Sequence, residues 1–323
     1  MKNIVICCDG TGNEYGDHNT NVVGLYSVAV NNDKQVTYYD PGVGTGGWQY
    51  EEESGLFRGT RDQATGEGVQ KNVEEAYRFL MQCYQDGDRI FLFGFSRGAF
   101  TVRALAGMLY TVGLLRIDND NLVEYASKLC NNNGGRYSDA IVSGFRSTFG
   151  RRCPAYFIGV WDTVESLILN GKKFFNYQLN PETKFGYQAL AIDEKRNDFP
   201  PCLWDERNKV LGQTIEQVWF AGVHSDVGGW YDERGLSNTA LLWMINKAKD
   251  CGMEVDEQRV AAYRSNPHDE IHDSYEGFWA FRGQYVRPIP SGSLIHASAV
   301  ERKERAANGY KPANFPTTCT IVN

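Results

Sequence analysis

The stretch Arg89-Ile90-Phe91-Leu92-Phe93-Gly94-Phe95-Ser96-Arg97-Gly98 decides how this sequence is interpreted. After Arg89, residues 90–94 form a continuous apolar run, which is typical of a strand buried on both faces of a parallel sheet. From Arg97 onward apolar residues recur at helical spacing. Gly94 and Gly98 flank Ser96 in the pattern Gly-x-Ser-x-Gly, which allows a serine to project from a sharp strand-to-helix turn. The stretch therefore predicts Ser96 to be a nucleophile at the carboxyl end of a buried strand.

Similar apolar runs and helical periodicities lie on both sides of this stretch. Strands are expected at residues 3–8, 35–39, 89–94, 155–161 and 217–223, and helices at 69–85, 97–114 and 237–249, the last with Ser237 as its N-cap. Residues 163–215 are expected to be largely irregular. The alternation predicts an α/β fold of the α/β-hydrolase type, with a mostly parallel sheet and helices on both faces. We expect one domain over residues 1–323, with 255–323 as a C-terminal extension.

Composition argues against several classes of protein. The formal net charge is −7, whereas a nucleic-acid binder is usually basic. No apolar run reaches transmembrane length, and the chain starts with a strand rather than a signal peptide, which leaves only peripheral membrane contact open. The eight cysteines are scattered and form no Cys-x-x-Cys pair, which favours reduced thiols in a cytoplasmic protein and argues against structural zinc. No pattern in the sequence indicates the oligomeric state.

A serine nucleophile needs a general base, usually histidine, and the chain has five histidines. In this fold the order along the chain is serine, acid, histidine, which excludes a histidine that precedes Ser96. His224 directly follows an apolar strand, where functional groups gather in parallel sheets. We therefore expect His224 to be the base, with His296 as the alternative.

The acid that orients this base should also follow a strand. Asp162 does so, directly after the run 155–161. Asp226 is the alternative, but it comes after His224 in the chain and is better placed to cap nearby backbone. We expect Asp162 to be the third member of a Ser-His-Asp triad.

An oxyanion hole is expected from two backbone segments. The N–H of Arg97 is the first donor, because it lies at the start of the helix that follows the nucleophile. The second donor should come from the loop after an early strand, which indicates Gly10 or Thr11.

Three other motifs suggest different functions, but each is less well supported by its sequence context. The start resembles Asp-x-Asp-Gly-Thr of haloacid-dehalogenase-type phosphatases, but Cys7 occupies the position of their nucleophilic aspartate. The glycine-rich loop 42–47 fits a dinucleotide motif only as letters, since no helix opens from it. The acidic and histidine-bearing segment 268–273 is more typical of a solvated surface than of a metal site. We therefore expect neither a cofactor nor a metal.

The combined motifs resemble a known family. They are Asp9-Gly10-Thr11-Gly12-Asn13, Gly94-Phe95-Ser96-Arg97-Gly98-Ala99, Val160-Trp161-Asp162-Thr163-Val164 and the segment 218–229 around His224. These motifs span about residues 3–245 and occur in the same order as in the family that they resemble. The chain resembles the α/β-hydrolases that include the catalytic domain of type VI secretion phospholipase effectors. The resemblance implies a triad of Ser96, Asp162 and His224, hydrolysis of an ester or phospholipid, and export as an effector.

These expectations converge on one function and one rival. We expect a serine hydrolase of carboxylic esters, with a lipid or phospholipid as substrate and an acyl-enzyme intermediate. The apolar segments 166–169, 174–177 and 278–281 are candidates for an acyl pocket or a lid. The rival is a catalytically silent protein of the same fold that acts as a binding or scaffold module.

Overall fold

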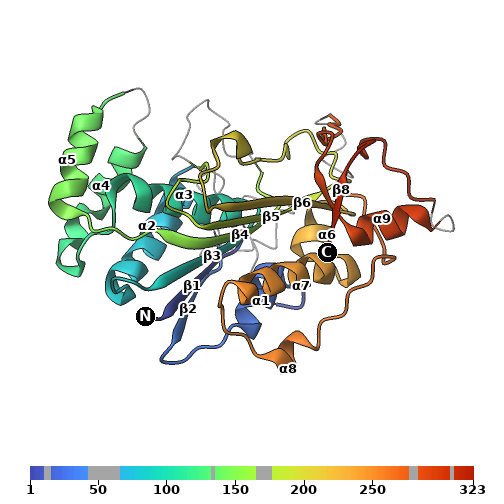
Figure 1. Cartoon of the computed structure of the whole chain (residues 1–323), viewed down its shortest axis with the longest axis horizontal. Coiled ribbons are helices and arrows are strands. Elements are labelled where there is room, and N and C mark those ends of the chain that lie inside the picture. The colour runs from blue at the N-terminus through green and yellow to red at the C-terminus, as the bar shows by residue number, and fades with distance from the viewer. Residues whose placement is uncertain (11–15, 43–65, 132–134, 165–176, 276–282, 306–308) are drawn as a thin grey trace, which may run out of the picture.

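The computed structural model describes residues 1–10, 16–42, 66–131, 135–164, 177–275, 283–305 and 309–323. Its centre is an eight-stranded sheet in the order β2-β1-β3-β4-β5-β6-β7-β8 (Figure 1). All seven strand pairs are parallel. The predicted α/β class with a mostly parallel sheet is therefore confirmed.

The strands span Asn3–Cys8 (β1), Gln35–Asp40 (β2), Arg89–Phe95 (β3), Ala155–Trp161 (β4), Phe185–Ala191 (β5), Thr214–Phe220 (β6), Leu294–His296 (β7) and Thr320–Val322 (β8). The α-helices span Asn21–Val28 (α1), Gly66–Cys83 (α2), Arg97–Val112 (α3), Val123–Cys130 (α4), Asp139–Phe149 (α5), His224–Gly228 (α6), Gly235–Asp250 (α7), Glu257–Val260 (α8) and Ala297–Glu304 (α9). In the described ranges, 3₁₀ helices span Ile117–Leu122 (η2) and Glu206–Asn208 (η3).

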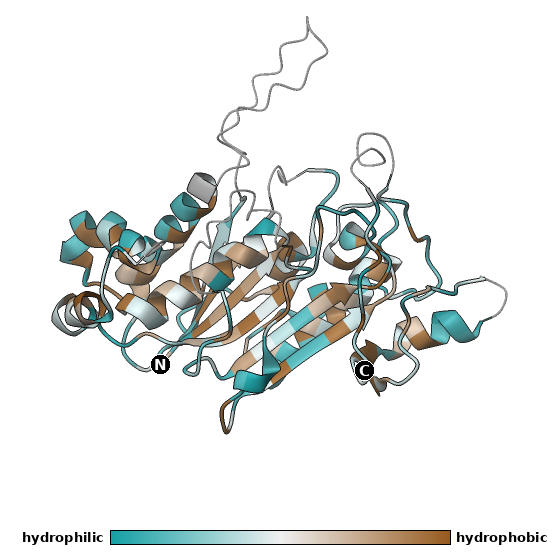
Figure 2. Cartoon of the chain, turned by 90° about the horizontal axis from the view of Figure 1, so that it is seen from above, coloured by the Kyte–Doolittle hydropathy of each residue, from teal (hydrophilic) through white to brown (hydrophobic). Residues whose placement is uncertain are grey.

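The central strands are apolar on both faces because helices cover both faces. Alternate residues of β1 and β3, such as Ile6 and Leu92, pack in one core cluster with α2, α3 and α4. Their neighbours, such as Cys7 and Phe93, pack in a second cluster with α1 and α7. The two-residue period of a strand sends successive side chains to opposite faces, so each face needs its own apolar cover. Figure 2 shows these apolar strands in the middle of the molecule.

Three strands were not predicted. β5 lies within residues 163–215, which were expected to be irregular, and Gln188 at its centre is completely buried. Its amide forms hydrogen bonds with Thr163, Cys202 and Gln217, which satisfy it inside the core. A buried polar residue of this kind interrupts the apolar pattern by which a strand is recognised in a sequence. β7 and β8 have only three residues each, too few to give a periodic signal.

The expected extension 255–323 contributes to the sheet. β7 pairs with β6, and β8 pairs with β7. We propose that the chain forms one domain, because these strands continue the sheet that begins with the N-terminal residues.

Two element ends differ from the prediction. β6 ends at Phe220 rather than at residue 223, and His224 begins the short helix α6. α7 begins at Gly235, so Ser237 lies inside the helix and donates its hydroxyl to the carbonyl of Arg234 instead of capping the N-terminus.

No helix among the described residues is long and apolar enough to cross a bilayer. All eight cysteines are described, and each is a free thiol.

Candidate active site

Two of the predicted site residues follow adjacent strands. Phe95 pairs with Trp161 at the ends of β3 and β4. The N–H of Ser96 donates to the carbonyl of Trp161 at 3.1 Å, and the N–H of Asp162 donates to the carbonyl of Ala189 at 2.8 Å. Because parallel strands end at one edge of a sheet, Ser96 and Asp162 are next to each other there.

Ser96 occupies a strained turn. Its φ is 56° and its ψ is −119°, a conformation that L-residues rarely adopt. Gly98 makes the turn feasible, because a Cβ there would lie 2.0 Å from the carbonyl oxygen of Cys8. A Cβ on Gly94 would lie 2.4 Å from the carbonyl oxygen of Gly98. Both glycines of the motif are therefore required by close packing of backbone on backbone.

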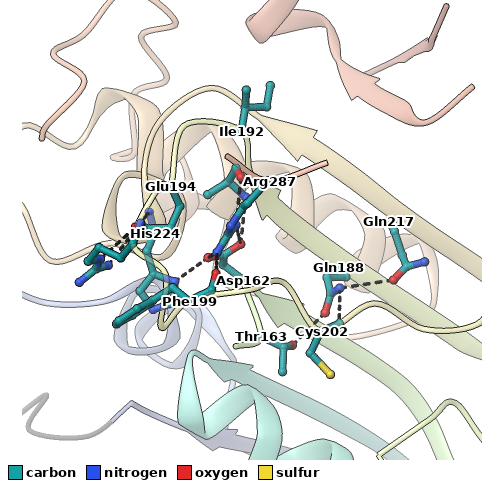
Figure 3. Close-up of polar contacts among 12 residues, drawn as sticks. Asp162, Thr163, Gln188, Ile192, Glu194, Phe199, Cys202, Gln217, His224 and Arg287 are labelled. Atoms are coloured by element: carbon teal, nitrogen blue, oxygen red, sulfur yellow. Dashed lines mark hydrogen bonds and ion pairs between the residues drawn. The ribbon is translucent and has the colours of Figure 1, made fainter. Parts of the chain in front are cut away.

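His224 reaches the same site from β6. Its Nδ1 lies 2.6 Å from Oδ2 of Asp162 (Figure 3), and the imidazole is buried. Its ring packs on Phe95, which directly precedes Ser96, with ring centroids 4.6 Å apart, and against Phe199. An ionised Asp162 can only accept, so Nδ1 carries the proton and Nε2 is left as an acceptor.

Asp162 is completely buried and carries a second strong partner, Arg287. The Arg287 guanidinium donates to both carboxylate oxygens, at 2.7 and 2.9 Å, and to the carbonyls of Ala191 and Phe199. Burial alone would raise the pKa of Asp162, but the charge of Arg287 and the hydrogen bond from His224 hold it well below its usual range. Arg287 was not predicted as a site residue, because no motif or spacing around it in the sequence links it to residue 162.

A second ion pair supports the backbone of His224. Oε2 of Glu194 accepts from the His224 N–H at 3.3 Å, and Arg196 donates to both oxygens of Glu194 at 2.9 and 2.8 Å. Burial opposes ionisation of Glu194, but Arg196 lowers the pKa of that carboxyl. Burial lowers the pKa of His224, and this effect exceeds the opposing influence of Asp162.

The alternative acid, Asp226, has a different environment. Its Oδ2 accepts from the N–H of Val223 at 2.9 Å, and its Oδ1 lies 2.6 Å from Nδ1 of His272. His272 also contacts Glu233 and stacks on Tyr231. Asp226 therefore caps the helix that begins with His224 and bonds to another histidine.

The alternative base, His296, lies at the end of β7, four strand positions from β3. At a strand spacing of about 4.8 Å this separation is roughly 19 Å. His296 stacks on Phe220, and its Nδ1 contacts the hydroxyl of Ser298 at 2.8 Å. Burial lowers its pKa to about 4. It lines a separate cavity of about 260 Å³ beside Trp243 and Lys247.

The expected oxyanion donors differ in whether their N–H groups are available to a ligand. Arg97 is the first residue of α3, and N–H groups of a first helical turn have no partner within their helix. The N–H of Gly10 instead donates to Oδ1 of Asp9 at 2.7 Å, so it can bind an oxyanion only if this bond is exchanged. Thr20 and Tyr39 hold the other oxygen of Asp9. Thr11 lies outside the described residues.

Within the described part of the chain, no group of three or more His, Cys, Asp or Glu side chains is arranged to hold a metal. In the segment 268–273, His268 contacts Glu301 and His272 bonds to Asp226. The candidate acyl-pocket segments 166–169 and 278–281 lie outside the described residues, as do residues 174–176.

The fold and the site define the class: an α/β protein of the hydrolase-like type, with a serine on a strained strand-to-helix turn and an aspartate–histidine pair beside it. Residues 2–247 match the family model described as "T6SS, Phospholipase effector Tle1-like, catalytic domain". The chain belongs to this family of lipid ester hydrolases, as the motifs at Ser96, Asp162 and His224 led us to expect.

The chain is also similar to individual proteins. The uncharacterized protein YEL023C of Saccharomyces cerevisiae is 32% identical over 217 residues, which are 61% of this chain and 32% of the yeast protein. An uncharacterized protein from Pseudomonas aeruginosa has a TM-score of 0.50 at 19% identity, covering 83% of this chain and 49% of the other. The Tle1 effector bound to the VgrG spike of the type 6 secretion system has a TM-score of 0.42 at 18% identity, with coverage of 72% and 52%. The chain thus spans about a third of the yeast protein and about half of the two solved ones.

Proposed function

We propose that this protein is a serine hydrolase that cleaves the acyl ester of a lipid, with Ser96 as nucleophile, His224 as general base and Asp162 as the acid that orients it. The observation that carries the proposal is the 2.6 Å contact between Nδ1 of His224 and the buried carboxylate of Asp162, at the sheet edge where Ser96 occupies its strained turn. The same three residues lie within the family match.

The chemistry follows from the protonation states. With its Nδ1 proton bonded to Asp162, His224 accepts the Ser96 hydroxyl proton on Nε2 while Oγ attacks the ester carbonyl carbon. The tetrahedral oxyanion binds the N–H groups at the start of α3, beginning with Arg97. Collapse breaks the bond to the leaving alcohol, which takes the proton from Nε2. Water, activated by His224, then hydrolyses the acyl-enzyme and restores Ser96.

The substrate class rests on family membership rather than on a described pocket. Phospholipase effectors give the family its name, so we propose a phospholipid or related acyl lipid as substrate. Export as an effector is a proposal that rests on the same membership.

The test compares the wild type with Ser96→Ala on p-nitrophenyl esters from C2 to C16 and on phosphatidylcholine and phosphatidylethanolamine vesicles. Loss of the nucleophile should reduce the rate by about 10⁴-fold or more. A fluorophosphonate probe should label the wild type at Ser96. Ser27→Ala is the control, because the Ser27 hydroxyl bonds within α1 and to Tyr263, away from the site. A wild type that neither hydrolyses esters nor reacts with the probe would support the scaffold alternative.

A further inference from the structure

Arg287 has an unusual position for a charged side chain. Its side chain is completely buried, and its guanidinium is bidentate on Asp162. It comes from beyond residue 247, where the family match ends. Its contact with the proposed catalytic acid therefore lies outside what the family assignment covers.

The contact has two physical consequences. A bidentate guanidinium fixes the plane of a carboxylate, and the N–H of Ala191 donates to the same Oδ1 at 3.0 Å, which leaves Oδ2 directed at His224. Arg287 also cancels the charge of Asp162 at close range. A carboxylate whose charge is already cancelled stabilises a neighbouring imidazolium less than a free carboxylate does.

The other charged groups described around His224 do not offset this weaker stabilisation of the imidazolium. Glu194 on its backbone is paired with Arg196, and Asp226 in its own helix is paired with His272. Among the described residues, the rings of Phe95 and Phe199 also pack on the imidazole. Asp162 with Arg287 and Glu194 with Arg196 sum to zero charge. Protonation of His224 would therefore place an uncompensated positive charge in a buried site.

We propose that Arg287 is a positioning residue of the active site, which holds Asp162 in the orientation that binds His224 and neutralises its charge, so that His224 remains an unprotonated base at a lower pH than a histidine beside an unpaired carboxylate. This inference rests on the proposed triad. It adds a residue to the site and a pH dependence that the triad alone does not specify.

The test measures kcat/KM for p-nitrophenyl butyrate from pH 4.5 to 9, since the acid limb of this profile reports the free-enzyme base. The wild-type limb should lie below about 6.5, the ordinary value for histidine. Arg287→Met should move the limb up by about one pH unit and lower the plateau by about 100-fold. Arg287→Lys keeps a positive charge without the bidentate geometry, so its limb should stay near that of the wild type while its plateau falls.

Arg103→Met is the matched control. Arg103 is also buried and also donates to backbone carbonyls, those of Tyr177 and Cys202, and to Gln188, none of which belongs to the proposed triad. This variant should lose stability without moving the acid limb. A second readout is the ¹H–¹⁵N NMR titration of His224, assigned with His224→Gln, which needs no activity and should give the same midpoints.

The outcomes separate the two proposals. A wild-type midpoint at or above 7, or an Arg287→Met midpoint equal to that of the wild type, would overturn the role of Arg287. If Ser96 reacts with the fluorophosphonate but either of these midpoint results is found, only the inference about Arg287 is wrong. If Ser96 is unreactive and Ser96→Ala keeps full esterase activity, the proposed triad itself is wrong.

Discussion

The two sides of the candidate site are built from different interactions. On the Ser96 side, backbone packs on backbone: Gly98 lies against Cys8, and the flanking strands are apolar on both faces. On the His224 side, two buried ion pairs hold the groups in place, Asp162 with Arg287 and Glu194 with Arg196. Close backbone packing positions the proposed nucleophile, whereas buried ion pairs position the proposed base. Substitutions on the two sides should therefore differ in their dependence on pH and in whether a second substitution can compensate them.

The largest effect is expected on the charged side, for Asp162→Asn. The amide cannot hold the His224 tautomer, so kcat should fall by about 10⁴-fold. Arg287 would become an unpaired buried cation, which should lower the free energy of unfolding by about 3 kcal/mol or more. Esterase kinetics and urea unfolding of the same variant measure the two losses separately.

The double variant Asp162→Asn/Arg287→Met sharpens this comparison. Removal of the unpaired charge should recover part of the lost stability and none of the activity. If the double variant is less stable than the wild type by the full sum of the two single effects, the two side chains do not act as a pair.

A smaller effect is expected on the packed side, for Gly98→Ala. The new Cβ would meet the carbonyl of Cys8 at 2.0 Å, so backbone must move, at a cost of about 3 kcal/mol that no pH change relieves. Gly144→Ala in α5 is the matched control. Nothing lies within 4 Å of its added Cβ, and alanine should stabilise that helix by about 1 kcal/mol. Equal thermal shifts in both variants would contradict the packing argument.

The smallest effect is expected for His272→Gln, at the edge of the charged side. Asp226 and Glu233 raise the pKa of His272 above its unfolded value, in spite of partial burial. The pairing energy is then fully present below the unfolded pKa, about 6.5, and is lost as the pH rises through the folded value. The difference in unfolding free energy between wild type and variant should be about 1 kcal/mol at pH 5.5 and smaller at pH 9. A difference that grows with pH would mean that the pKa of His272 is lowered, rather than raised, by folding.

The same division separates the parts of this protein that sequence patterns can predict from those that they cannot. The strands that end at residues 8, 95 and 161 were predicted because apolar runs between turns have few other interpretations. Their ends then indicated Ser96 and Asp162 as site residues. β5 was missed, because Gln188 interrupts its apolar run and finds its partners on segments distant in sequence.

The sequence by itself determined the α/β class, the serine turn and its two glycines, because these depend on local patterns of apolar residues and on backbone strain within a few positions. Only the tertiary structure decided between the alternative partners and showed the ion pairs that surround them. It bonded Asp226 to His272 and left His296 on a distant strand. It also brought Arg287 onto Asp162 across 125 positions of the chain. Ion pairs of this kind have no periodicity and no fixed spacing, so they become visible only when the chain is folded.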